Sequence, residues 1–130
     1  MTSPFKPEGY ISVSPYLITA SAGRVIEFLT RVFNATALRR FDMPDGTIAH
    51  AEVKIDDSVV MLGEAGGDWP AAPCHIHVYV ADVDATYRRA LAAGGVSVKE
   101  PTQRGEDDPD RRGGVKDPGG NTWWIGTQVG

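Results

Sequence analysis

The chain has 130 residues, of which 42% are hydrophobic and 23% charged, which is the length of one ordinary domain and enough apolar material to exclude a disordered chain. Lys and Arg number 13 against 17 Asp and Glu, a net charge of −4, and no basic stripe carries interleaved aromatic residues, so nucleic-acid binding is not expected. The first ten residues lack a signal-peptide pattern and no apolar run approaches the roughly 20 residues that span a membrane, so we expect one cytoplasmic domain over residues 1–130.

The first half of the chain predicts a strand, a helix and three further strands. A β-branched and aromatic run favours the first strand, and Ser21-Ala22-Gly23 then offers a helix start. Apolar residues recur with helical spacing beyond it, and Pro44-Asp45-Gly46 has the composition of a hairpin turn. The predicted elements are a strand over 11–19, a helix over 24–33, a hairpin over 37–43 and 47–55, and a strand over 58–63.

The second half predicts the same order of elements after a linker over 64–73 that is dense in Gly, Ala and Pro. Asp82 is a suitable cap at the start of its helix, and Gly94-Gly95 is a suitable stop. The predicted elements are a strand over 75–80, the helix, a strand over 96–102, a polar loop over 105–114, a short run over 113–116 and a strand over 121–128.

The two halves align as one βαβββ unit written twice. Their first strands align at Ser14 and His75, 61 residues apart, and their last strands at Met61 and Trp124, 63 residues apart. We therefore expect module one at about 10–64 and module two at about 74–128. Because one helix cannot cover a sheet stably alone, we predict an α+β fold in which paired modules form a curved, cup-shaped sheet of eight strands with the helices outside.

Period-two alternation assigns the strand residues to two faces. The outer face, toward the helices, should carry Val13, Leu17, Val53, Val60, Leu62, Ile76, Val78 and Val80. The inner face should carry Ser14, Tyr16, His50, Glu52, Val59, Met61, His75, His77, Tyr79, Thr122 and Trp124. A concave wall of aromatic, hydrogen-bonding and imidazole groups is typical of a small-molecule site, although a row of His and Tyr also suits a half-solvated sheet surface or a dimer contact.

The repeat and its residues resemble the vicinal oxygen chelate superfamily of glyoxalases, bleomycin-resistance proteins and extradiol dioxygenases. The resemblance covers nearly the whole chain and looks most like the PhnB-like branch. It implies a glyoxalase-like fold of paired modules and a homodimer. The segments that carry it are VSPYLITASAGRVIEFLTRVFNA, GTIAHAEVKIDDSVVML, HVYVADVDATYRRALAAGG and KDPGGNTWWIGT.

Superfamily members that bind a divalent metal carry His and Glu at four positions of the cup floor. The resemblance places Ser14, Met61, His75 and Trp124 at these positions. One imidazole cannot hold an ion that ordinarily takes three or four protein ligands, so no metal and no cofactor are expected at this site. A displaced divalent-metal site built from His50, Glu52, His75 and His77 is the alternative.

A floor of neutral and apolar side chains favours binding of an organic ring. The predicted function is therefore binding of a small, aromatic molecule, with Ser14, Tyr16, His50, Met61, His75, His77 and Trp124 as ligand-binding residues. The alternative is a lyase, isomerase or dioxygenase that uses the displaced metal site, or a metal-free enzyme with His75 or His77 as general base. A purely structural dimer with a filled cup is a third reading.

Four further features remain, and two of them have two readings. Trp69 is either a lid over the cup or a contact with the partner subunit, and Trp123 belongs to the core. The charged segment GEDDPDRRGG is a solvated turn, or it brings Arg111 or Arg112 to an acidic group of the ligand. Cys74 is a small buried hydrophobe, because the chain has no second cysteine.

Overall fold

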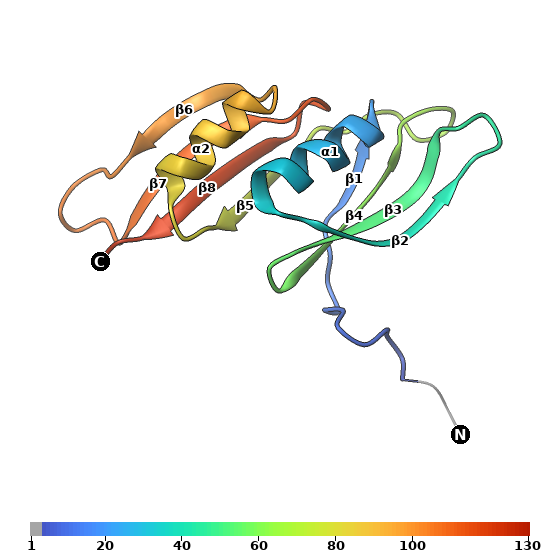
Figure 1. Cartoon of the computed structure of the whole chain (residues 1–130), viewed down its shortest axis with the longest axis horizontal. Coiled ribbons are helices and arrows are strands. Elements are labelled where there is room, and N and C mark those ends of the chain that lie inside the picture. The colour runs from blue at the N-terminus through green and yellow to red at the C-terminus, as the bar shows by residue number, and fades with distance from the viewer. Residues whose placement is uncertain (1–3) are drawn as a thin grey trace.

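The computed structural model describes residues 4–130 and shows two modules of the same element order lying side by side (Figure 1). The α+β fold class is confirmed, but the eight strands form two hydrogen-bonded sheets of four rather than one of eight. The first module contains β1 (Tyr16–Thr19), α1 (Ala22–Phe33), β2 (Thr36–Asp42), β3 (Ile48–Ile55) and β4 (Ser58–Glu64). The second contains β5 (His75–Tyr79), α2 (Val83–Ala92), β6 (Val96–Thr102), β7 (Asp110–Lys116) and β8 (Thr122–Gln128).

The strand pairing repeats between the modules. The sheet orders are β1-β4-β3-β2 and β5-β8-β7-β6, in which β1 runs parallel to β4 and β5 runs parallel to β8. Tyr16 pairs with Met61 in the first sheet, and His77 pairs with Trp124 at the equivalent place in the second. The two sheets therefore place equivalent residues at equivalent positions.

Each helix buries one apolar stripe on its sheet. In α1 the stripe includes Val25, Leu29 and Val32, which are all buried, as the helical spacing predicts. In α2 the side chain of Asp82 accepts a hydrogen bond from the Ala85 N–H at 3.1 Å, which is the predicted cap. The core between helices and sheets includes Leu17, Val53, Val60, Leu62, Val115, Trp123 and Ile125.

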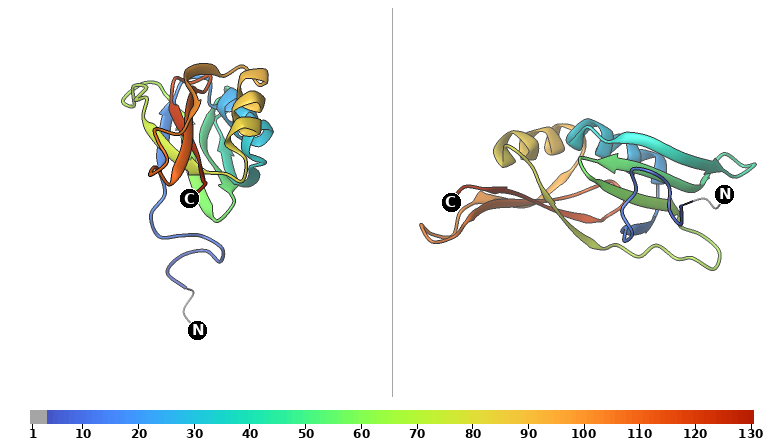
Figure 2. Two further views of the ribbon diagram at one scale, coloured as in Figure 1. Left: turned by 90° about the vertical axis from the view of Figure 1, so that its left-hand side faces the viewer. Right: turned by 90° about the horizontal axis from the view of Figure 1, so that it is seen from below.

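Both helices cover the same side of the molecule, and no helix of the described chain covers the opposite side of the sheets (Figure 2). We call this opposite side the open face, although the N-terminal segment covers part of it, where Tyr10 bonds to the buried Glu52. The helices contact each other where the modules meet, and the Phe33 ring lies 5.3 Å from that of Trp123 across the junction. No helix of the described chain is long and apolar enough to cross a membrane.

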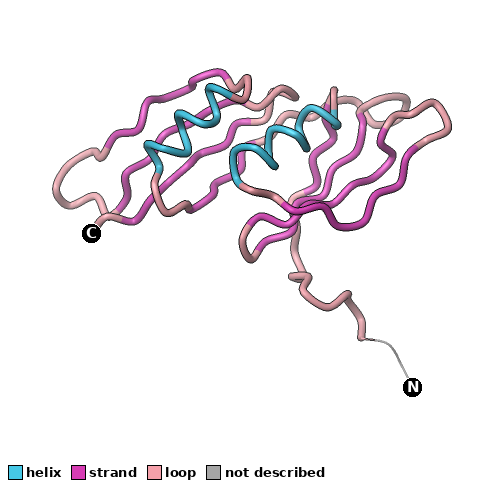
Figure 3. The backbone as a smooth tube through the Cα atoms, viewed as in Figure 1, coloured by secondary structure: helices cyan, strands magenta, loops and turns pink. Residues whose placement is uncertain are grey.

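Local departures from the predicted elements have identifiable causes. The first strand begins at Tyr16, after a loop (Figure 3), and Val13 is 82% exposed rather than packed under a helix. Pro15 precedes the strand and has no N–H to offer to a ladder. Strand β7 begins at Asp110, inside the predicted polar loop, where Asp110 pairs with Gln128 and its carboxylate accepts hydrogen bonds from Tyr79 and Arg112.

Alternation is interrupted near the start of β3. Ile48 is buried with the core, and its Cδ1 lies 3.8 Å from the position that a Cβ on Gly23 of α1 would take. The β2–β3 register shifts between Phe41 and Asp42 at this place. A bulge of this kind changes which face a side chain joins, so the strict alternation predicted for residues 47–55 begins only at His50.

A loop of the second module is fitted tightly against the first. A Cβ at Gly119 would lie 1.9 Å from Thr19 Oγ1 and 2.9 Å from Val25 Cγ2. The Thr19 hydroxyl also donates a hydrogen bond to the Gly119 carbonyl at 3.4 Å. Glycine at this position therefore allows the two modules to dock.

Gly119→Ala is expected to lower the free energy of unfolding by about 1–2 kcal/mol, because overpacked sites cost in this range when neighbours must shift. Urea denaturation of the variant measures the loss. The matched control is Gly105→Ala, since a Cβ at Gly105 meets nothing within 4 Å. Equal stability of the two variants would contradict this account of the junction.

Candidate functional site

On the open face of the first module, four polar side chains form one hydrogen-bonded chain, which we call the Tyr16 network. The Tyr10 hydroxyl donates to Glu52 Oε1, and His50 Nε2 lies 2.8 Å from Glu52 Oε2. His50 Nδ1 lies 2.9 Å from the Tyr16 hydroxyl, and the two rings are 5.5 Å apart. The network thus leads from a carboxylate that is 5% exposed to a phenol that is 48% exposed.

The hydrogen bonds of the network set its charge. Burial by itself raises the pKa of Glu52, but the hydrogen bonds from His50 and Tyr10 outweigh burial and leave the pKa below its ordinary value. The hydrogen bond to Glu52 raises the pKa of Tyr10. Glu52 is therefore an ionised carboxylate at neutral pH, and Tyr10 keeps its proton.

A pocket of about 470 Å³ adjoins the network, and we call it the Tyr16 pocket. Its lining residues are Tyr16, Ile18, Ala49, Gly63, Glu64 and Trp69. Glycine keeps the floor open, because a Cβ at Gly63 would lie 2.7 Å from the Ala49 carbonyl oxygen and 3.4 Å from the Tyr16 hydroxyl.

Trp69 reaches the Tyr16 pocket from the linker between the modules. A pair of backbone hydrogen bonds of 2.8 and 2.9 Å joins it to Gly66 and forms a small hairpin-like turn. Its side chain is 66% exposed, so one face of the indole is available to a ligand. Both readings of Trp69, as a lid and as a contact with the partner subunit, stay predictions.

On the second module, His75 and Trp124 form a stacked pair. Their rings lie 6.1 Å apart at 9°, and Trp124 Nε1 donates to His75 Nδ1 at 3.0 Å. Gly114 makes room for the indole, because a Cβ there would lie 2.7 Å from the ring. This pair presents a flat, half-exposed aromatic surface.

A second cluster on the same module joins His77 to charged groups. The Tyr79 hydroxyl donates to Asp110 Oδ2 at 2.7 Å, and Arg112 Nη2 donates to the same oxygen at 3.0 Å. The His77 and Tyr79 rings meet edge to face at 4.7 Å. Burial and then the Arg112 charge lower the pKa of His77, while the hydrogen bond to Asp110 raises the pKa of Tyr79.

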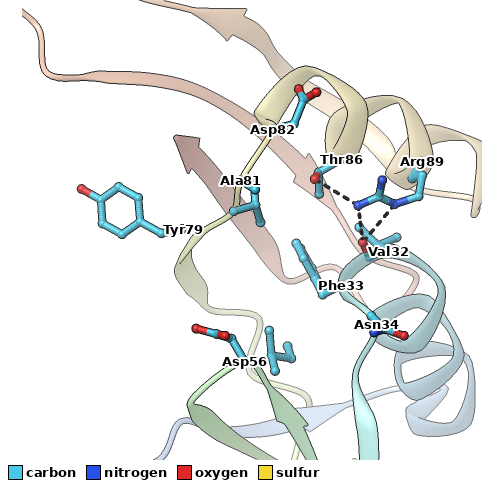
Figure 4. A pocket seen from close by; sticks show the side chains of 11 residues that line it. Val32, Phe33, Asn34, Asp56, Tyr79, Ala81, Asp82, Thr86 and Arg89 are labelled. Carbon is cyan, nitrogen blue, oxygen red and sulfur yellow. Dashed lines mark hydrogen bonds between the residues drawn. The ribbon is translucent and has the colours of Figure 1, made fainter. Parts of the chain in front are cut away.

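Further pockets lie at the junction of the modules, and Tyr79 of the second cluster lines two of them. One of about 490 Å³ is lined by residues that include Phe33, Asp56 and Arg89 (Figure 4). Arg89 does not point freely into it: its guanidinium donates to the Val32 carbonyl at 3.1 and 3.3 Å and to Thr86 at 3.1 Å. This arginine therefore holds the end of α1 to α2.

The predicted ligand-binding residues fall into two groups. Tyr16, His50 and Met61 are neighbours in the first sheet, and His75, His77 and Trp124 are neighbours in the second. Ser14 precedes β1 and is part-buried beside the first group. Each group forms as alternation predicts, but the two sheets lie side by side in one chain instead of closing a cup (Figure 2).

The residues at the four superfamily metal positions do not fit a metal centre. Ser14 and Met61 are poor ligands for a hard divalent ion, and the Trp124 indole offers a donor rather than a lone pair. His75 Nδ1 already accepts the Trp124 N–H. The displaced metal site is divided between the sheets, because His50 and Glu52 lie in the first sheet whereas His75 and His77 lie in the second.

Sequence reasoning missed several residues of these clusters. Tyr10 lies in a loop with no periodicity, so nothing local indicates its bond to Glu52. Asp110 belongs to the segment that the sequence predicts as a solvated turn, yet it is buried and accepts a hydrogen bond from Tyr79. Arg111 contacts Asp84 of α2 at 2.8 and 2.9 Å, and Arg112 contacts Asp110, so both arginines already have carboxylate partners in the chain.

Comparisons with known proteins agree with this geometry. A model of the glyoxalase/bleomycin resistance protein/dioxygenase superfamily matches residues 11–125. An uncharacterised protein of Mycobacterium bovis is 36% identical over 131 residues, covering 91% of this chain and 84% of its own length. The crystal structure of TioX from Micromonospora sp. ML1 has a TM-score of 0.71 at 25% identity, covering 91% of this chain and 100% of its own. A PhnB protein from Bacillus cereus, described as a putative 3-demethylubiquinone-9 3-methyltransferase, has a TM-score of 0.70 at 15% identity, covering 90% and 99%.

Proposed function

The chain belongs to the glyoxalase/bleomycin resistance protein/dioxygenase superfamily, and on that premise we propose that it binds a small organic molecule with an aromatic ring. The observation that carries the proposal is the Tyr16 pocket, whose volume of about 470 Å³ lies between a phenol and an indole. Small-molecule sites commonly occupy about 300–1,000 Å³ and combine aromatic walls with a few polar groups. A ring inserted between Tyr16 and Trp69 satisfies both conditions.

The energetics of the pocket favour a ring over a polar ligand. Aromatic pairs contribute about 0.5–1.5 kcal/mol beyond the burial of their area. Ile18 and Ala49 add apolar surface to the wall, and Met61 lies beside Tyr16 in the register. Tyr16 and Trp69 therefore supply the binding surface, while the hydroxyl of Tyr16 orients the ligand.

We also propose that a second copy of the chain covers the open face. The stacked His75–Trp124 pair and the Tyr16 network lie on this face, and no helix of the described chain covers it (Figure 2). A homodimer would enclose the bound ring between first-module and second-module surfaces. We assign the protein to the PhnB-like branch on the sequence segments that carry that resemblance.

A screen of aromatic compounds tests the binding function. Hits are expected to quench Trp fluorescence, and Trp69→Ala is expected to weaken their binding by about tenfold because one wall of the pocket is lost. Trp69→Phe, which keeps a ring, should retain most of the affinity. Isothermal titration calorimetry measures the affinities of both variants.

The same measurements can contradict the proposal. If no aromatic compound binds, the function is wrong. If every hit binds Trp69→Ala as tightly as the native chain, the Tyr16 pocket is not the site.

A further inference from the structure

The polar groups of the Tyr16 pocket determine which ligand groups it can bind, an inference that rests on the proposed function. Glu52 is buried and accepts two hydrogen bonds, from Tyr10 and from His50. An ionised carboxylate only accepts. His50 Nε2 must therefore carry a hydrogen, and in a neutral imidazole this leaves Nδ1 as an acceptor.

The state of His50 fixes the direction of the next hydrogen bond. In that neutral tautomer Tyr16 is the donor of the 2.9 Å hydrogen bond between its hydroxyl and His50 Nδ1. A tyrosine hydroxyl has one hydrogen, and that of Tyr16 is donated to His50. The phenol oxygen therefore presents only lone pairs to the pocket.

The carboxylate of Glu64 is a second acceptor in the wall. Glu64 lines the pocket, and its Oε1 accepts the Ala22 N–H at 3.3 Å. The six described residues that line the pocket include this acid and no Lys or Arg. A ligand group beside Tyr16 and Glu64 thus meets two acceptors and a negative charge.

We propose that the Tyr16 pocket selects an aromatic ring that carries an aliphatic amine, which binds as an ammonium and donates hydrogen bonds to the Tyr16 oxygen and to the Glu64 carboxylate. The faces of Trp69 and Tyr16 attract such a cation as well as its ring, and Trp is the strongest partner for cation–π contacts. A ligand carboxylate would meet Glu64 as a like charge. A neutral alcohol would donate one hydrogen bond without the charge.

The test uses three probes that share a naphthalene ring: 1-naphthylmethylamine, 1-naphthylmethanol and 1-naphthoate. Isothermal titration calorimetry at neutral pH should give the affinity order amine, alcohol, carboxylate, with about tenfold or more between the first and the last. If the carboxylate binds at least as tightly as the amine, the inference is wrong while ring binding stands. If none of the three probes binds, the proposed function itself fails.

Two variants separate the acceptors. Glu64→Gln keeps an oxygen for the Ala22 N–H and removes the charge, so it should weaken amine binding by about tenfold and leave alcohol binding unchanged. Tyr16→Phe should weaken both amine and alcohol. The control is Asp68→Asn, which removes the same charge from an exposed site outside the pocket lining. An equal effect of Glu64→Gln and Asp68→Asn would contradict a local role for Glu64.

A measurement without ligand tests the role of His50 as a positioning residue. Nitrogen–proton correlation spectra distinguish the two imidazole tautomers, and the hydrogen is expected on Nε2. A hydrogen on Nδ1 would reverse the direction of the Tyr16 bond and overturn the inference, whatever the stability of the protein.

Discussion

Asp117→Ala is expected to lower the free energy of unfolding by about 3–5 kcal/mol, because each buried donor left without an acceptor costs about 1–3 kcal/mol. Asp117 is buried, and its Oδ2 accepts from Trp123 Nε1 at 2.8 Å and from Asn121 Nδ2 at 3.0 Å. Its Oδ1 accepts the backbone N–H groups of Gly119 and Asn121 at 2.8 and 3.1 Å. Removal of the carboxylate leaves a core indole and a buried amide unsatisfied.

Urea denaturation of the native chain and of two variants measures this effect. Asp117→Asn retains one acceptor oxygen and should lose less stability than Asp117→Ala. The control is Asp107→Ala, because Asp107 is exposed, and it should stay within about 0.5 kcal/mol of the native chain. A loss below about 1 kcal/mol in Asp117→Ala would show that water replaces the carboxylate, and that the loop does not depend on it.

Glu52→Gln should destabilise the chain by about 1.5–3 kcal/mol at neutral pH, the value of hydrogen bonds to a charged group. The amide offers a single acceptor oxygen, whereas the carboxylate accepts from Tyr10 and from His50. One of these two donors must lose its partner or reorient. The loss is measured by urea denaturation at several pH values.

The pH dependence of this loss has a defined sign. The pKa of Glu52 in the folded chain lies below its ordinary value, so its ionised form stabilises the fold above about pH 4.3, the ordinary pKa of a glutamate. That stabilisation is lost as the pH falls through the folded pKa. The native chain and Glu52→Gln should therefore converge in stability at acid pH, and a constant difference down to acid pH would contradict the charged network.

The order of elements could be predicted from the sequence because each element has a strong local signal. The apolar spacing of α1 and the cap at Asp82 are local, and both are confirmed. Alternation also placed Leu17 and Val53 under the helices correctly. It failed near Ile48, where a register shift that depends on the neighbouring strand changes the face, and at Val13, which precedes the paired part of β1.

The parts of the candidate site that lie within one sheet could be predicted from the sequence, but the contributions of the loops could not. Period-two spacing groups Tyr16 with His50 on one sheet and His75 with Trp124 on the other, since these contacts lie within a sheet. The contribution of Tyr10 depends on how a loop folds back onto β3, and that of Trp69 on the path of the linker. Neither path leaves a periodic pattern in the sequence.

The edge strands β2 and β6 affect how readily the protein aggregates. Strands β2 and β6 have a neighbour on one side only, and such strands can recruit another molecule and grow into fibres. Arg39 and Arg40 charge the first margin, while Lys99 and Pro101 charge and interrupt the second. Register shifts distort both strands as well. Edge-to-edge pairing through β2 and β6 is thereby disfavoured.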